Sequence, residues 1–308
     1  MNYTLHQLRI FSKIVETKSI TQAARELHLS QPAVSIQLKK LQDQFEIPLT
    51  ELIGRQLYIT PFGQEIASAG QRILEEVHAI KDRTLAYKGL LAGKLRLSVV
   101  STAKYVTPYF LSDFLKQHPG IDIQITVTNK SQVLRDLEYN EVDFTMMSVL
   151  PTRIAYEKME LLPNKLYLIG GRSLPFPVAD FKPIMLKKLP FIFREPGSAT
   201  RQQMEQFLLS RNVTRLKRLE LTSNEAVKQA VIAGLGYSIL PLIGIKNEIM
   251  NGDLQIIPLK GLPIISAWHL VWPPHKKFSP VAAAYLQFVA DKKEAIVSNN
   301  FSWYQKYS

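Results

Sequence analysis

The sequence contains no cysteine, and this absence excludes several kinds of site at once. Such a chain forms no disulfide, binds no metal through thiolate and has no cysteine nucleophile. It also has no run of about 18 uninterrupted apolar residues, the length that marks a membrane-spanning helix. The N-terminus, MNYTLHQLRIF, lacks a basic region followed by an apolar one. We therefore expect no secretory signal, no membrane partner and a location in the cytoplasm.

Motifs for catalysis are also missing. GLGYS lacks the third glycine of a dinucleotide loop, and neither the GxSxG nucleophile elbow nor a GxxxxGK phosphate loop occurs. The histidines are scattered without metal-ligand spacing, at His6, His28, His78, His118, His269 and His275. We expect no catalytic residue, no metal and no cofactor, so an enzyme is the weaker hypothesis.

The length and charge of the chain favour several domains and an anionic partner. With 308 residues, 46% of them hydrophobic, the chain is long enough for two or three domains. The formal net charge is +12, but residues 1–93 hold 11 Lys and Arg against 9 Asp and Glu, a net of +2. The remaining +10 lies in residues 94–308, where an anionic small ligand and a solvated basic surface both explain it.

The stretch SITQAARELHLSQPAVSIQLKKLQDQF, residues 19–45, has the pattern of two amphipathic helices joined by a polar turn. In the first helix apolar residues recur every three or four positions, and Thr21 and Gln22 lie on the polar face. Ser30 is placed to cap the second helix, and Pro32 to lie in its first turn, where a backbone NH has no intrahelical partner.

The second helix has two faces of different chemistry. One is apolar, whereas Gln31, Ser35 and Lys39, spaced by four residues, line another beside Ile36. Small polar groups reach base edges in the DNA major groove and lysines meet phosphates, so we interpret this as a recognition helix. Taken alone, the stretch fits an ordinary surface hairpin with Ile36 packed on a neighbour equally well.

The flanking segments extend the motif. Before it, residues 5–15 carry an apolar helical face, which completes a three-helix unit. After it, IPLTELIGRQLYITPFG has prolines and glycines around two short β-prone runs and predicts a small hairpin, or wing. We place Arg55, near its tip, against a phosphate or the minor groove; a plain solvated charge is the alternative.

A long helix follows the wing. Thr60 caps it, Pro61 opens it, and no other proline interrupts it before about Tyr87. A narrow apolar stripe runs along it through Ile66, Ile73, Val77, Ile80 and Tyr87. Such a stripe is typical of a helix that pairs with another helix, and we expect it to join two chains. Packing against its own domain is the alternative.

Strands and helices alternate through the rest of the chain. Runs at 94–100, 121–128, 142–149, 165–171, 190–194, 236–241 and 266–272 predict strands. Helices are predicted near 106–117, 131–140, 199–211, 224–234 and 279–296. This is an α/β pattern, and we expect a mostly parallel sheet or sheets.

Together these pieces resemble LysR-type transcriptional regulators over essentially the whole chain. The resemblance rests on LHQLRIFSKIVETKSITQAARELHLSQPAVSIQLKKLQ, GRQLYITPFG, REPGSATRQQME and NEAVKQAVIAGLGYSILP. The stretch LRLSVVSTAKYVTPYFLSDFLKQHPGI is closest to the branch that regulates carbon-fixation genes. One departure concerns the wing: the family's usual aromatic, acidic, arginine run is replaced by Thr50, Glu51 and Leu52, which leaves Arg55 as its basic contact.

The resemblance implies a domain order and a set of partners. It implies an all-α winged helix-turn-helix at 1–60, a dimerising linker helix at 61–90, an effector domain at 94–298 and a tail at 299–308. The effector domain is expected to have two α/β lobes joined by crossing strands, as in periplasmic binding proteins.

The expected partners are an inverted-repeat DNA operator, a small metabolite and a second copy of the chain, as a dimer or tetramer. RNA polymerase is a further candidate. The residues that we predict to contact DNA are Thr21, Gln22, Ser30, Gln31, Pro32, Ser35, Lys39 and Arg55.

The effector site is predicted from polar residues at strand ends. Ligands in such folds bind where strand ends meet helix starts, and the exposed NH groups there favour anions. The candidate effector residues are Ser101, Thr102, Lys104, Ser131, Ser148, Ser198, Thr200 and Arg201. We predict a small anion, a phosphorylated sugar or a carboxylate, held by these hydroxyls and by Arg201. Each hydroxyl taken singly is also explained by capping. The alternative functions are a periplasmic-type solute receptor and a metabolite sensor without DNA binding.

Overall fold

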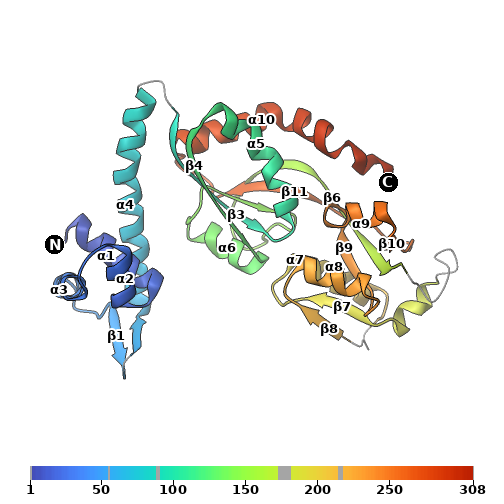
Figure 1. Cartoon of the computed structure of the whole chain (residues 1–308), viewed down its shortest axis with the longest axis horizontal. Coiled ribbons are helices and arrows are strands. Elements are labelled where there is room, and N and C mark those ends of the chain that lie inside the picture. Colours follow the sequence, from blue (N-terminus) through green and yellow to red (C-terminus); the bar gives the residue numbers. More distant parts are fainter. Residues whose placement is uncertain (1, 55, 88–90, 173–181, 214–217, 308) are drawn as a thin grey trace. The chain divides into compact units, whose positions relative to one another are not determined.

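The computed structural model describes residues 2–307 apart from 55, 88–90, 173–181 and 214–217. Residue contacts divide the chain into two compact units, 1–90 and 91–308 (Figure 1). Each unit buries apolar side chains of its own, so each has a separate hydrophobic core.

The first unit contains a three-helix bundle and a two-stranded wing. Its elements are α1 (Leu5–Thr17), α2 (Ile20–Glu26), α3 (Gln31–Gln42), β1 (Thr50–Ile53), β2 (Gln56–Ile59) and α4 (Pro61–Tyr87). Hydroxyls cap the first three helices at Thr4, Ser19 and Ser30. Each hydroxyl accepts a hydrogen bond from the backbone NH three residues later. The helices meet around Ala23 of α2 and Val34 of α3, which are both fully buried. Because the side chain of Ala23 is small, it permits close packing of the helices.

The first half of α4 packs on its own unit. Thr60 Oγ1 accepts from the Gly63 NH at 2.9 Å, which starts the helix as predicted. A Cβ at Gly63 would lie 2.0 Å from the Leu49 carbonyl oxygen, so only glycine allows this approach. Gly70 lies against Leu8 of α1, whereas Ile73, Val77 and Ile80 of the stripe are exposed. The first half of the helix therefore packs on its own domain, and pairing of chains through the exposed residues stays a prediction.

The second unit has two lobes. Lobe I contains β3 (Ala92–Val100), η1 (Ala103–Tyr105), α5 (Thr107–Gln117), β4 (Gly120–Thr128), α6 (Lys130–Glu138), β5 (Phe144–Met147) and α10 (Pro280–Phe301). Lobe II contains η3 (Pro183–Lys188), β7 (Phe191–Arg194), α7 (Ala199–Ser210), β8 (Arg218–Leu221), α8 (Asn224–Ile232), β9 (Ser238–Pro241), η4 (Leu242–Gly244), α9 (Lys246–Asn251) and β10 (Leu254–Ile256). Two long strands, β6 (Glu157–Gly171) and β11 (Ile264–Trp272), cross between the lobes (Figure 1).

The sheet is mixed, so the expectation of mostly parallel strands is wrong for the residues described. The order is β10-β6-β11-β5-β3-β4, with β9 also paired to β6. β3 is parallel to β4 and β5, and β7 to β8. All pairs of β6 and β11 are antiparallel. The cause is topological: β6 and β11 carry the chain between the lobes in opposite directions, which local alternation of side chains does not reveal.

Several boundaries differ from the expectations. β6 begins at Glu157, eight residues before the predicted strand, because Pro163 and charged side chains interrupt its apolar pattern. β8, β10 and α9 were not predicted. At the other end α10 continues to Phe301 and is followed by η5 (Ser302–Tyr307). Phe301 and Tyr304 are buried, so residues 299–307 pack on the effector domain and do not form a free tail.

Candidate functional site

The exposed face of α3 has the chemistry expected of a DNA-reading helix. Val34, Leu38 and Leu41 are buried, and the opposite side exposes Gln31 and Lys39. Ile36 is 54% exposed. Within the first unit, therefore, Ile36 does not pack on a neighbouring segment.

Two predicted DNA contacts on α3 touch each other. Gln31 Nε2 donates to the half-buried Ser35 Oγ at 3.1 Å, so the two polar groups form one surface in the first two turns. Ser30 Oγ accepts from the Ala33 NH at 3.4 Å, and Pro32 lies in the first turn. As the cap of α3, Ser30 has a structural role. It is also exposed, beside the polar surface that Gln31 and Ser35 form.

The predicted contacts outside α3 are placed less fully. Thr21 and Gln22 are exposed on α2, where Gln22 Nε2 donates to Glu26 Oε1 at 3.0 Å. Arg55 lies outside the described residues, so its predicted contact stays a prediction. At the departure from the family pattern, Leu52 is exposed on β1. The described part of the wing therefore offers an apolar side chain where the family usually offers a basic one.

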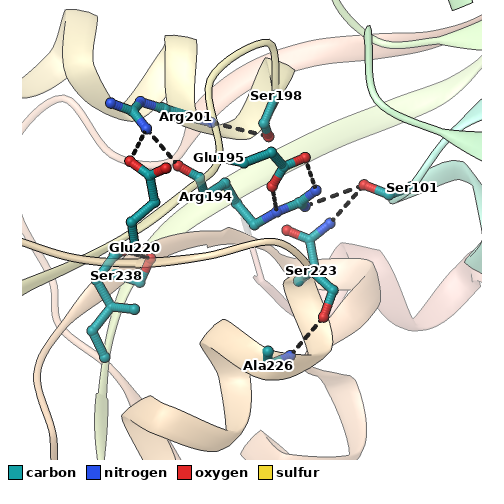
Figure 2. Close-up of polar contacts among 11 residues, drawn as sticks. Ser101, Arg194, Glu195, Ser198, Arg201, Glu220, Ser223, Ala226 and Ser238 are labelled. Atoms are coloured by element: carbon teal, nitrogen blue, oxygen red, sulfur yellow. Dashed lines mark hydrogen bonds and ion pairs between the residues drawn. The ribbon is translucent and has the colours of Figure 1, made fainter. Parts of the chain in front are cut away.

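In the second unit, Arg194 joins the two lobes (Figure 2). It is the last residue of β7, its side chain is only 2% exposed, and its Nη1 donates to Ser101 Oγ of lobe I at 3.1 Å. Its Nε and Nη2 donate to the two carboxylate oxygens of Glu195 at 2.7 and 2.8 Å. A buried guanidinium therefore lies where the lobes meet, and an anionic group already occupies its two-point face.

Asn224, the first residue of α8, completes this contact. Its Nδ2 donates to Ser101 Oγ at 3.3 Å, while its buried Oδ1 has no partner among the described residues. If the amide is turned the other way, the nitrogen is left without a partner instead. A buried polar atom without a partner is costly, so the Asn224 amide can take a further hydrogen-bonding group between the lobes.

Arg201, the predicted charge partner, points to a different place. It donates to Glu220 at 2.5 Å, to Glu205 at 3.0 Å and to the Arg194 carbonyl oxygen at 2.9 Å. In Figure 2 its side chain extends to Glu220, on the side away from Ser101. Burial disfavours its charge, but the hydrogen bonds to Glu220 and Glu205 outweigh this and raise its pKa. Arg201 is therefore held by two carboxylates within lobe II.

The remaining predicted effector residues lie on both lobes. Thr102, Ser148, Ser198 and Thr200 are buried, whereas Ser131 and Lys104 are exposed. Ser198 caps α7, and Lys104 Nζ lies 4.9 Å from the centre of the Tyr105 ring.

A cavity of about 450 Å³ separates the starts of α6 and α7. Its lining includes the predicted residues Ser131, Ser198 and Arg201. Lys130 Nζ bridges it by donating to Gln202 Oε1 at 3.0 Å, and burial lowers the pKa of Lys130. Gly197 has a φ of +87°, which favours glycine, and it lies against Ser131 of the other lobe. The cavity thus brings part of the predicted set together.

Sequence reasoning missed the residues that connect the lobes. Arg194 stands at the end of a predicted strand, the position that draws attention to Ser101 and Ser148, but a strand-ending arginine is also a common surface residue. Asn224 lies in NEAVKQ, where it reads as a helix start. Both residues could have been found by the rule that identified the hydroxyls, because Arg194 lies at a strand end and Asn224 at a helix start.

Comparison with known proteins gives this arrangement a family. Residues 5–64 match the description "Bacterial regulatory helix-turn-helix protein, lysR family", and residues 88–294 match "LysR substrate binding domain". The chain belongs to the LysR family. As a LysR regulator it is a sequence-specific DNA-binding transcriptional regulator with a two-lobed effector domain, as the sequence predicts.

Individual relatives of this LysR regulator confirm the resemblance to carbon-fixation regulators. It is 36% identical to the transcriptional activator CmpR of Synechocystis, over 96% of this chain and 97% of that protein. It is also 36% identical to the RuBisCO operon transcriptional regulator of Allochromatium vinosum, over 94% and 96%. A solved structure, the Synechocystis CcmR regulatory domain in complex with 2-PG, is 33% identical with a TM-score of 0.61. That match covers 66% of this chain and 98% of the solved one.

The relatives are transcriptional regulators and not enzymes. Within the described residues, no three His, Asp or Glu side chains are placed to hold a metal ion. Over the same residues, no helix has the length and apolar character needed to cross a membrane.

Proposed function

We propose that this LysR regulator responds to a small phosphorylated acid, bound between the lobes of its effector domain by Arg194. The observation that carries the proposal is the buried Arg194 guanidinium, which reaches Ser101 across the lobes at 3.1 Å. Asn224 supports it, since one polar atom of its buried amide lacks a partner in the described part. With the Asn224 amide turned so that its nitrogen lacks the partner, a ligand oxygen could accept from that nitrogen and from Arg194.

Helix starts add favourable electrostatics. Asn129, Ser198 and Ser223 cap α6, α7 and α8, which begin on both lobes. Helix starts carry partial positive charge and free NH groups, so they stabilise an anion. In the proposed site the hydroxyl donors come from the predicted set: Ser101, Thr102, Ser131, Ser148, Ser198 and Thr200. Lys104 and Arg201 supply positive charge near the anion and do not bind it directly.

The choice of a phosphorylated acid rests on the relative. The CcmR regulatory domain is described in complex with 2-PG, 2-phosphoglycolate, and shares 33% of its residues with this chain. This ligand carries a phosphoryl and a carboxylate group, both of which suit arginine and hydroxyl donors. The same class of ligand is what the basic excess of residues 94–308 favours.

We further propose how the first unit reads DNA. Gln31 and Ser35 contact base edges, Lys39 neutralises phosphate, and the α2–α3 corner contributes Thr21, Gln22, Ser30 and Pro32. Arg55 is assigned to the minor groove. We assign DNA reading to residues 1–60, pairing of chains to 61–90 and effector binding to 94–298. The protein is proposed to act in the cytoplasm, where its DNA lies, without catalytic activity.

A two-part experiment tests this function. Footprinting of the purified protein on DNA upstream of its own gene should protect an inverted repeat. Calorimetry with 2-phosphoglycolate should give saturable one-site binding, and this binding should change the footprint. A protein that protects no inverted repeat, or that binds the ligand in no measurable way, would contradict the corresponding half of the proposal.

A further inference from the structure

The Arg194–Glu195 pair places a carboxylate inside the proposed anion site. Glu195 immediately follows Arg194, and its two oxygens bind Nε and Nη2 at 2.7 and 2.8 Å. The Glu195 side chain is 17% exposed, whereas that of Arg194 is 2% exposed. The cation is thus enclosed, while its counter-ion has a side open to solvent.

We propose that Glu195 is an internal competitor for the effector, which restricts the site to ligands that carry a doubly charged phosphoryl group. This inference rests on the proposed effector site at Arg194. An oxyanion that binds arginine in two-point geometry needs two adjacent nitrogens, and Glu195 holds Nε and Nη2. Since Nη1 is engaged by Ser101, the ligand must displace Glu195 to gain that geometry.

Because Glu195 is the residue next to Arg194 in the chain, it competes strongly with simple carboxylates. A free carboxylate offers Arg194 the same charge and the same two oxygens, but it must be brought from solution. A group on the next residue acts at a high effective concentration, in the millimolar range or above. A dilute monocarboxylate therefore gains nothing by exchanging with Glu195.

A phosphoryl group differs in charge and in the number of its oxygens. It carries about −1.5 to −2 charges and three acceptor oxygens at neutral pH. Two oxygens can replace those of Glu195 on Arg194, and the third remains for Ser101 or the Asn224 amide. The extra charge and hydrogen bond offset the displacement, so Glu195 sets the interaction strength that a ligand must exceed, without contacting the ligand.

The substitution Glu195→Gln tests this inference in the full-length protein. An amide has one acceptor oxygen and cannot pair with both nitrogens. Affinity for inorganic phosphate, for glycolate and for 2-phosphoglycolate should rise about tenfold or more. The three factors should be alike, because each ligand displaces Glu195 to reach the same two nitrogens. Calorimetry measures all three.

Thermal unfolding is a second measurement, in which Glu195→Gln should lower the stability of the ligand-free protein although it raises ligand affinity. Without ligand, Glu195→Gln leaves a buried cation without its carboxylate and should lower Tm. Phosphate should then raise Tm more in the variant than in the wild type, since stabilisation of the folded state by a ligand grows with the logarithm of its affinity. A residue that only holds Arg194 in position would instead weaken binding of all three probes when replaced.

Glu220→Gln is the matched control, because it removes a carboxylate from Arg201 and leaves the Arg194–Glu195 pair intact. Its affinities for all three probes should equal those of the wild type. If Glu195→Gln does not fold, Glu195→Asp should show the same rise in affinity at smaller size, since the shorter side chain spans both nitrogens poorly.

The outcomes separate the inference from the proposed function. If the wild type binds 2-phosphoglycolate and neither Glu195 variant raises the affinity for any probe, the inference is overturned and the effector site stands. Weaker binding of every probe by the variants also overturns it. If no probe binds to the wild type or to the variants, the proposed effector class fails and the inference with it.

Discussion

At the scale of single residues, two arginines of similar sequence context have different surroundings. The sequence favours Arg201, three residues after a capping serine. In the structure Arg201 is bound by Glu205 and Glu220, while Arg194 reaches across to lobe I. Sequence could not reveal this, because Glu220 lies on β8, a strand that has no clear pattern. The charge of a side chain can be predicted from sequence, but its partner depends on tertiary structure.

The two arginines can be distinguished by substitution. Arg194→Ala should weaken binding of 2-phosphoglycolate about 100-fold, because it removes a buried charge-assisted contact worth about 3 kcal/mol. Arg201→Ala should change this affinity by less than about fivefold, since screened, indirect charge effects are small. Calorimetry on both variants, with DNA binding as the check of folding, measures the difference. The reverse order of effects would assign the anion to Arg201, as the sequence alone predicts.

On α3, Ser35 and Lys39 are predicted to have different roles in DNA binding. Ser35→Ala should change which operator sequence is preferred, because it removes a base-edge contact and the hydrogen bond from Gln31. Lys39→Ala should weaken binding to all sequences alike and reduce the slope of log affinity against log salt by about one unit. Gel shifts on operator and random DNA at several salt concentrations separate the two. Identical effects of both substitutions on the two DNAs would disprove the division of roles.

At the scale of elements, the sequence predicts best where periodicity and caps agree. α2 and α3 lie where Ser19, Ser30 and the apolar spacing place them. β6 was predicted at half its length, since strand pairing with β11 and not local pattern holds Glu157 to Asn164 in the sheet. The hydroxyls of the candidate site were found from strand ends and helix starts. Arg194 and Asn224 were not, because their importance arises from contacts across the lobes.

The exposed half of α4 leads to a prediction about assembly. Ile73, Val77 and Ile80 are exposed in the single chain and follow the stripe of a paired helix. The double substitution Ile73→Asp and Val77→Asp should convert the protein to monomers, because it places charges in an apolar seam. It should leave the fold unchanged, since neither side chain is buried. Light scattering after size exclusion measures the mass.

Gln71→Asp, on α4 but off the stripe, is the control for the added charge. Its mass should equal that of the wild type. If the double variant keeps the wild-type mass, pairing does not use this stripe.

At the scale of the whole molecule, net charge points to an anion but does not locate it. Three cations of the described effector domain are paired with carboxylates: Arg194 with Glu195, Arg201 with Glu205 and Glu220, and Lys228 with Glu225 and Glu248. These groups add no positive charge to the net +10 of residues 94–308, so that excess does not by itself mark the site at Arg194. The site is located instead by polar atoms without partners and by contacts between lobes.

Regulation requires that the effector site in one unit and the DNA-reading face in the other be coupled, and the coupling must be reciprocal. If 2-phosphoglycolate changes operator affinity by some factor, operator DNA must change 2-phosphoglycolate affinity by the same factor, and about 5- to 150-fold is typical. Arg194→Ala should retain operator binding but lose its response to the ligand. A Gln31→Ala, Ser35→Ala variant should bind the ligand with the affinity of the DNA-free wild type, and operator DNA should not alter it. Fluorescence anisotropy for DNA and calorimetry for ligand measure the four affinities. Ligand binding that leaves operator affinity unchanged, with wild-type protein and intact operator, would mean that this site does not regulate DNA binding.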